Sequence, residues 1–419
     1  MENNEQRIQF LEKNYRRNYL SFLGEGFFYS FAFYLFSVTN VFPDYVSRMT
    51  DDPVVLSLLS VLYYGPVYLA SIVSCWLSLN APATPKRLGL TICYSQRVGL
   101  ILIALSSLMI GKAPVSVCLV CFFVAFLFFN IADGISAPLY YNMASSMIYR
   151  NIGTFFGAYN MVGSVSGVFA SLLLTYLYSV KPYPGNYQLM FGIGVLFALA
   201  SSFMVAFGTK EYPGAKAEKV GVTWKELPQM MMKCISENRK FRNYTIIYVI
   251  LGAADFAMPL YSIRLAQQEN LPANFIGIMS LISLVSGVAA NWIWGRLSDR
   301  KGPFFVLVLS TICGICAAVL TILNPGGLWN YAAYSLIAFA SCGSSLTNNI
   351  ACTIYAEDGN STLLTSTSKL CAAPICILAS IGSGVLAQWT SLKVVFAIAL
   401  CAYTICLVLS TLNVRKRVE

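Results

Sequence analysis

Apolar stretches long enough to cross a lipid bilayer recur along this chain of 419 residues, separated by short polar breaks. Crossing the hydrocarbon core as a helix takes about 20 residues. Only 11% of the residues are charged, whereas soluble domains carry roughly a quarter. The sequence therefore predicts an all-α, polytopic membrane protein with about twelve spans and no room for a soluble domain.

The spans fall into two groups of six. They are expected at 19–42, 54–79, 88–110, 115–140, 155–180 and 187–208, and then at 245–263, 275–294, 303–323, 328–356, 363–388 and 392–412. The domain organisation follows from this grouping. It consists of an N-terminal segment (1–18), a first six-helix bundle (19–208), a middle loop (209–243), a second six-helix bundle (244–414) and a tail (415–419).

Lysine and arginine outside the spans gather in the N-terminal segment, the middle loop and the tail, which lie on one side if the chain crosses twelve times. Basic residues accumulate on the cytoplasmic side of membrane proteins. We therefore expect a cell-membrane protein with both termini and the middle loop in the cytoplasm. The net charge of +10 then suits the lipid bilayer and its anionic headgroups, and no nucleic-acid partner is expected.

The middle loop carries a capping-box spacing at Thr223 and Glu226, followed by apolar residues at helical intervals. This pattern predicts an amphipathic helix that lies on the membrane surface. Pro228 fits poorly inside a helix that begins at Trp224, which favours a later start. A simple tether between two bundles is an equally good interpretation of this loop.

Histidine is absent, and most of the 13 cysteines lie inside the expected spans. Cysteine inside a span behaves as a small apolar residue. The CxxC pairs Cys118/Cys121 and Cys313/Cys316 therefore do not predict a metal site, because no histidine is present to complete a mixed ligand set. The same absence removes Ser/His/Asp and Cys/His catalysis. We expect no enzyme activity, metal or cofactor.

One short triplet occurs in both halves of the chain. The triplet Arg-Asn-Tyr occurs at 17–19 and again at 242–244, just before the first span of each half. Transporters are often built from such repeats, with the binding site between them.

The string Gly-Arg-Leu-Ser-Asp-Arg-Lys-Gly at 295–302 resembles the G-x-L-[AS]-D-R-x-G signature of the major facilitator superfamily. The resemblance implies the fold of that family and a conformational latch formed by Gly295, Asp299, Arg300 and Gly302. Glycine allows close helix approach and a tight turn, and a carboxylate can face a helix N-terminus. A merely basic turn on the inner face is the alternative.

Two other segments depart from the family patterns. The equivalent first-half loop, 80–87, keeps basic residues and lacks the glycine and the aspartate. Residues 130–134 resemble the R-x-x-Q-G pattern of span 4, with Asn130 in place of the arginine and Asp133 in place of the glutamine. Span 5 lacks the G-P-x-x-G-G string of many proton-linked drug exporters, which argues against efflux without excluding it.

Ionisable side chains inside spans are costly and mark candidate functional sites. They are Glu25, Arg97, Asp133, Asp255 and Lys369. The resemblance implies that spans 1, 4, 7 and 10 line a central cavity, and the three acids lie on three of these spans. Burial favours the protonated form of a carboxyl group, so Glu25, Asp133 and Asp255 are proton-coupling candidates. Pairing of Arg97 with Glu25 or Asp133 is the structural alternative.

Uncharged polar groups complete the candidate site. The substrate-cavity candidates are Tyr29, Asn130, Asn348, Asn349 and Arg97. Polar residues in spans more often stabilise helix packing, which is the competing interpretation for each of them. Lys369 lies near a span end, where its side chain can reach the interface.

We therefore expect a secondary active transporter, monomeric and proton-coupled, that moves a small organic solute by alternating access. A cavity rich in Phe and Tyr favours a neutral, amphipathic or weakly charged solute, and import and export both stay open. The rival hypothesis is a transport-inactive solute sensor or accessory binding protein with the same fold. A resemblance of this kind fixes fold more than chemistry.

Overall fold

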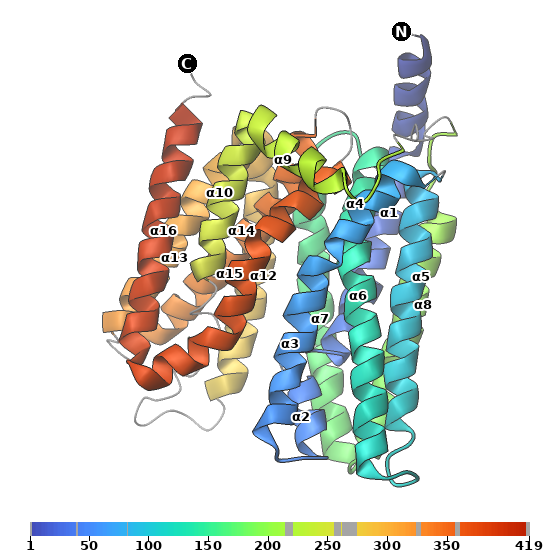
Figure 1. The fold of residues 1–419 in the computed structure, drawn as a ribbon, viewed down its shortest axis with the longest axis vertical. Coiled ribbons are helices and arrows are strands. Elements are labelled where there is room, and N and C mark those ends of the chain that lie inside the picture. The colour runs from blue at the N-terminus through green and yellow to red at the C-terminus, as the bar shows by residue number, and fades with distance from the viewer. Residues whose placement is uncertain are drawn as a thin grey trace. The chain divides into compact units, whose positions relative to one another are not determined.

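The computed structural model describes residues 2–38, 41–81, 83–213, 221–254, 261, 275–323, 328–356 and 361–415. The regular elements in these ranges are helices, as the sequence predicts (Figure 1). Eight of the described helices are long and apolar enough to cross a membrane. The chain is thus an all-helical, polytopic membrane protein.

The chain divides into two compact units. The first comprises Met1–Arg150 and Val165–Leu227, and the second comprises Asn151–Ser164 and Pro228–Glu419. The boundary between them passes through one long helix, whose first turns belong to the second unit.

Eight helices are described between Glu2 and Gly208. They are α1 (Glu2–Leu35), α2 (Val41–Ser47), α3 (Pro53–Leu69), α4 (Ser71–Asn80), α5 (Pro85–Ser107), α6 (Val115–Met147), α7 (Ile152–Val180) and α8 (Gly185–Gly208). The expected N-terminal segment and first span form the single helix α1, whose early residues are mostly good helix formers. This helix ends at Leu35, before the predicted end of the first span at residue 42, and the short helix α2 begins at Val41.

The expected second span is split into α3 and α4, which meet at Ala70. Pro66 lies four residues before this break. Proline lacks a backbone N–H and its ring clashes with the preceding turn, so it bends or breaks a helix. Hydropathy alone does not register such a break.

Aromatic side chains form the centre of the first unit. Phe42 stands edge-on to Phe122 and Phe126, with ring centroids 5.3 Å apart in each pair. The rings of Tyr45 and Phe191 belong to the same cluster, with their centroids 5.4 Å apart. These rings join α2 to α6 and α8, and edge-to-face pairs of this kind stabilise beyond the area they bury.

Seven helices are described from Leu227 onward. They are α9 (Leu227–Glu237), α10 (Arg239–Ala254), α12 (Phe275–Lys301), α13 (Pro303–Leu323), α14 (Leu328–Ile354), α15 (Ser361–Trp389) and α16 (Leu392–Arg415). Within this unit α13 packs against α14 and α16. Gly302 has a φ of +90°, which suits glycine, and it allows the turn that starts α13 at Pro303.

The middle loop contains the predicted helix with its later start, since α9 begins at Leu227 and Pro228 lies in its first turn. The backbone N–H of Thr223 donates to the Glu226 carboxylate at 2.9 Å. Hydrogen bonds from the backbone and the hydroxyl of Thr223 hold the pKa of Glu226 below its usual range. The ionised carboxylate therefore caps the chain just before α9.

Candidate functional site

Three ionisable residues predicted from the sequence lie inside the first unit. Glu25 is on α1, Arg97 on α5 and Asp133 on α6. Glu25 and Arg97 are 3% and 4% exposed, whereas Asp133 is only half-buried. Asp255, the third proton-coupling candidate, lies outside the described residues.

Glu25 and Arg97 form an ion pair. The guanidinium Nη2 of Arg97 is 3.7 Å from Oε1 of Glu25, and the hydroxyl of Tyr140 donates to Oε2 at 2.5 Å. The carboxylate therefore contacts both a cation and a neutral donor. This arrangement corresponds to the structural pairing considered for Arg97.

Arg97 is held by further acceptors from α8. Its Nη2 donates to the hydroxyl of Ser201 at 2.9 Å, and its Nε donates to the carbonyl of Ala198 at 3.3 Å. The guanidinium also lies over the ring of Tyr29, 4.6 Å from its centroid. A buried guanidinium with this many partners has a fixed position.

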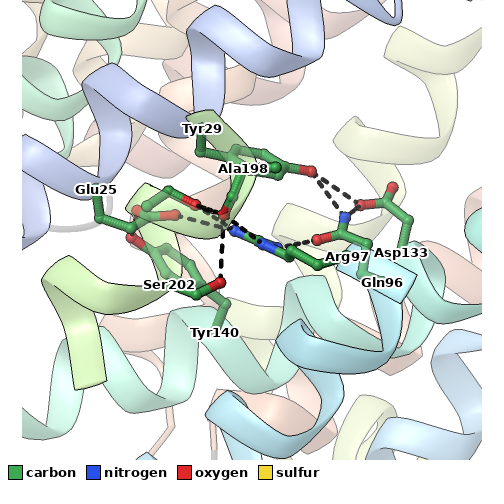
Figure 2. A network of polar contacts seen from close by, with 9 residues as sticks. Glu25, Tyr29, Gln96, Arg97, Asp133, Tyr140, Ala198 and Ser202 are labelled. Atoms are coloured by element: carbon green, nitrogen blue, oxygen red, sulfur yellow. Dashed lines mark hydrogen bonds and ion pairs between the residues drawn. The ribbon is translucent and has the colours of Figure 1, made fainter. Parts of the chain in front are cut away.

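Gln96 joins this ion pair to Asp133 (Figure 2). Its side-chain oxygen accepts from Nη1 of Arg97. Its Nε2 donates to Oδ1 of Asp133 and to the hydroxyl of Tyr29, the latter at 2.7 Å. The Tyr29 hydroxyl lies 3.5 Å from the same Oδ1. One chain of polar contacts thus runs from Glu25 through Arg97 and Gln96 to Asp133.

Gln96 is the functional candidate that sequence reasoning missed. It is 1% exposed, and it belongs to the same turn of α5 as Arg97. A neutral amide in a span usually stabilises helix packing, so its presence alone does not indicate a functional site. The available signal was its position directly beside a buried arginine.

The position of Asp133 depends on close packing between α3 and α6. A Cβ on Gly134 would lie 2.7 Å from the carbonyl oxygen of Val67 and 2.9 Å from that of Pro66. Only glycine allows this approach without a shift of the backbone. This approach places Asp133, the residue before Gly134, next to the contact between α6 and α3.

The uncharged candidates have different surroundings. Asn130 is fully buried, and its Nδ2 donates to the carbonyl of Phe126 at 2.9 Å while its Oδ1 has no partner. In the second unit, Asn348 accepts from the hydroxyl of Tyr244 at 2.9 Å. Asn348 and Asn349 are 8% and 9% exposed. Asn348 and Asn349 belong to the second unit, whereas Asn130 belongs to the first.

Two of the predicted latch residues, Gly295 and Asp299, lie against the first turns of α7. Oδ1 of Asp299 accepts from the backbone N–H of Gly153 at 2.8 Å, and Oδ2 accepts from that of Thr154 at 2.7 Å. A Cβ on Gly295 would be 2.8 Å from the carbonyl oxygen of Gly153. Arg300 is exposed. The carboxylate therefore caps a helix N-terminus, where unpaired N–H groups and the helix dipole favour a negative charge.

The corresponding loop of the first half makes different contacts. Nζ of Lys86 donates to the carbonyls of Ala206 and Thr209 at 2.9 and 2.7 Å, and its backbone N–H donates to Glu211 at 2.9 Å. A lysine at the C-terminal end of a helix satisfies carbonyls that lack a helical partner. Lys86 thus ties the start of α5 to the end of α8 within the first unit.

The sequence matches a known protein family over most of its length. The family model described as Major Facilitator Superfamily matches residues 26–366. The chain belongs to the Major Facilitator Superfamily. The resemblance carried by residues 295–302 is thereby confirmed, and the family is one of transporters rather than enzymes.

Solved structures show the same fold at low sequence identity. The major facilitator transporter FucP in its outward conformation has a TM-score of 0.73 at 13% identity, with 94% of this chain and 98% of that chain covered. The human organic anion transporter MFSD10 (TETRAN) has a TM-score of 0.69 at 11% identity, with 94% and 99% covered. A POT family transporter in complex with a thioalcohol-conjugated peptide reaches 0.66 at 14% identity, with 95% of each chain covered. No curated protein matches the sequence.

Proposed function

We propose that this protein is a proton-coupled secondary active transporter that moves a small organic solute by alternating access, with Asp133 as the principal proton carrier. Membership of the superfamily supplies the transporter fold. The coupling and the role of Asp133 are inferred from the polar network of the first unit.

The contrast between the two acids of the first unit carries this proposal. Glu25 is almost fully buried and faces the guanidinium of Arg97. Asp133 is half-buried and accepts hydrogen bonds from the uncharged Gln96 and Tyr29. An opposite charge nearby favours the ionised carboxylate, and a carboxyl group that exchanges protons has to be within reach of water. Proton exchange is therefore assigned to Asp133, the more accessible of the two acids, and Glu25 with Arg97 forms its scaffold.

The other candidates receive roles that follow from this assignment. Tyr29 and Gln96 hold Asp133 in place, and Asn130, Asn348 and Asn349 are reserved for uncharged contacts with the solute. Asp255 is the acid that the second half contributes. The contact between Asp299 and the start of α7 acts as the latch of one conformational state, since it can form in one state and break in another.

The orientation inferred from basic residues completes the proposal. Both termini and the middle loop lie in the cytoplasm, and the protein works as a monomer in the cell membrane. The domain limits expected from the sequence serve as the functional division into two bundles joined by the middle loop.

Purified protein in vesicles, with an imposed pH gradient and a broad panel of small organic solutes, tests this function. Proton coupling predicts that at least one solute moves against its own gradient and that the movement stops when a protonophore collapses the pH gradient. If solutes bind but none moves with the gradient, the carrier proposal is wrong. The rival proposal of a transport-inactive sensor then takes its place.

A further inference from the structure

The side-chain amide of Gln96 has its orientation fixed by Arg97. A guanidinium carries N–H donors and no acceptor, so the amide atom that faces Nη1 of Arg97 has to be the oxygen. In the structure that atom is Oε1 of Gln96. The amide nitrogen Nε2 is therefore turned the other way, where it donates to Oδ1 of Asp133 and to the hydroxyl of Tyr29.

Arg97 is in turn held by groups on other helices. Its Nη2 lies 3.7 Å from Oε1 of Glu25 and donates to the hydroxyl of Ser201 at 2.9 Å. Gln96 and Arg97 are 1% and 4% exposed, so bulk water does not compete for their hydrogen bonds. The direction in which the amide of Gln96 points is therefore set by buried contacts.

Tyr29 extends this order of donors and acceptors. Its hydroxyl accepts from Nε2 of Gln96 at 2.7 Å. The single hydroxyl hydrogen is directed to Oδ1 of Asp133, 3.5 Å away. Oδ1 of Asp133 thus faces two donors (Figure 2). One is the amide of Gln96, and the other is a hydroxyl whose oxygen is already engaged by the same amide.

Donors that point at a carboxyl group favour its ionised form. The nitrogen that Gln96 presents cannot accept a hydrogen bond, so it gives no help to a protonated Asp133 that has a hydrogen to donate. Hydrogen bonds arranged in a chain also polarise one another. The positive charge of Arg97 therefore strengthens the donor that Gln96 presents to Asp133.

We propose that Gln96 is a positioning residue that transmits the charge of Arg97 to Asp133 and thereby sets how readily Asp133 takes up a proton. The proposal rests on the proposed function, in which Asp133 exchanges the proton, and adds the residue that regulates this exchange. The competing role for an amide inside a span is helix packing. The two roles differ in what a change of Gln96 does to the protonation of Asp133.

The helices packed against α6 are α1, α3, α4 and α5. The titratable side chains around Asp133 are Glu25 and Tyr29 of α1, Tyr63 of α3, and Cys93 and Arg97 of α5. The sequence of α4 contains no Asp, Glu, Lys or Arg. A substitution of Gln96 leaves all of these groups in the chain, so a change in the protonation of Asp133 reports the loss of the amide.

Infrared difference spectroscopy of the purified protein over a stepped pH series tests the proposal. A protonated carboxyl group has a C=O stretching band that an ionised carboxylate lacks. The part of this band that disappears in Asp133→Asn belongs to Asp133. Its intensity gives the ratio of protonated to ionised Asp133 at each pH, and the measurement needs no solute.

Two substitutions of Gln96 change the hydrogen bonds in different ways. Gln96→Leu removes the donor, whereas Gln96→Glu keeps the shape, pairs with Arg97 and turns an acceptor towards Asp133. At a fixed pH we expect the ratio of protonated to ionised Asp133 to rise roughly 10-fold in Gln96→Leu and further in Gln96→Glu. Each variant is compared with the same variant carrying Asp133→Asn, which removes the band of the added carboxyl group from the difference.

Gln188→Leu is the matched control. Nε2 of Gln188 donates to the carbonyl of Ser107 at 3.1 Å, so this glutamine also joins two spans of the first unit, outside the network. The ratio for Asp133 should stay at the wild-type value in this variant. A packing role for Gln96 predicts a lower temperature of unfolding in Gln96→Leu without the ordered rise of the ratio from wild type through Gln96→Leu to Gln96→Glu.

An unchanged ratio in the Gln96 variants would overturn the proposal, and so would an equal rise in Gln188→Leu. If Gln96→Leu does not fold, Gln96→Glu alone gives the answer, because it keeps the size of the side chain. A wild-type Asp133 band that grows as the pH falls but is insensitive to Gln96 would keep Asp133 as the proton carrier and remove only the role of Gln96. No Asp133 band at any pH would remove the proton carrier of the proposed function as well.

Discussion

The carboxylate of Asp299 caps α7 by accepting the backbone N–H of Gly153 at 2.8 Å. This contact joins the last turn of α12 to the first turn of α7, which begins only one residue before Gly153, at Ile152. Charge-assisted hydrogen bonds of this kind are stronger than neutral ones. This contact therefore stabilises the conformation described here, and under the proposed latch role it breaks when the protein changes state.

Asp299→Asn tests this contact. The substitution keeps the size of the side chain and removes its charge, which costs roughly 1–2 kcal/mol at a helix N-terminus. We expect a lower midpoint of thermal unfolding in detergent and faster exchange between conformations, followed by hydrogen–deuterium exchange at residues 152–156. Lys301→Gln, an exposed change at the end of α12, is the control. Equal protection of α7 in both variants would contradict the latch.

Gly295 permits the close approach beneath that contact. A Cβ at this position would lie 2.8 Å from the carbonyl oxygen of Gly153 and 3.0 Å from Cα of Gly157. Gly295→Ala should therefore destabilise the protein by roughly 1–3 kcal/mol, as overpacking does. Gly192→Ala is the matched control, because nothing lies within 4 Å of its added Cβ and alanine favours helix. Thermal unfolding should rank Gly295→Ala lowest and place Gly192→Ala at or above the wild type.

Arg97 and Glu25 should behave as a coupled pair. Removing one partner of a buried ion pair leaves an uncompensated charge and costs about 3–5 kcal/mol. We expect Arg97→Gln to unfold at a much lower temperature than the wild type. The double variant Arg97→Gln with Glu25→Gln should recover much of this loss, since neither charge is then left alone. A double variant that is as unstable as the sum of the single variants would show that the two residues act independently.

The sequence predicts more of the fold than of the site. Apolar runs separated by Pro, Gly and charged residues predict the helices from α5 to α8 closely, because hydropathy reports burial in lipid directly. The break at Ala70 escapes this reasoning, since Pro66 interrupts the helix without making the segment polar. The continuous helix α1 escapes it as well, because its first residues are polar and still favour helix.

Only part of the candidate site could be predicted from the sequence. A charged side chain inside a membrane span is energetically costly and therefore rare, so Glu25, Arg97 and Asp133 stand out in the sequence as candidates. Which acid pairs with Arg97 depends on helix packing and required the structure. Gln96 carries no charge, and its two-sided contact with Arg97 and Asp133 has no signature in sequence alone.

Flux through reconstituted Asp133→Asn protein tests the central claim most directly. An imposed pH gradient drives solute movement in the wild type, and we predict that this drive is abolished in the variant, because the residue that carries the proton is gone. Solute exchange without a gradient is measured in the same vesicles. Exchange should persist in the variant, because exchange of solute for solute needs no net proton transfer. Gradient-driven flux at the wild-type rate in Asp133→Asn would contradict the account.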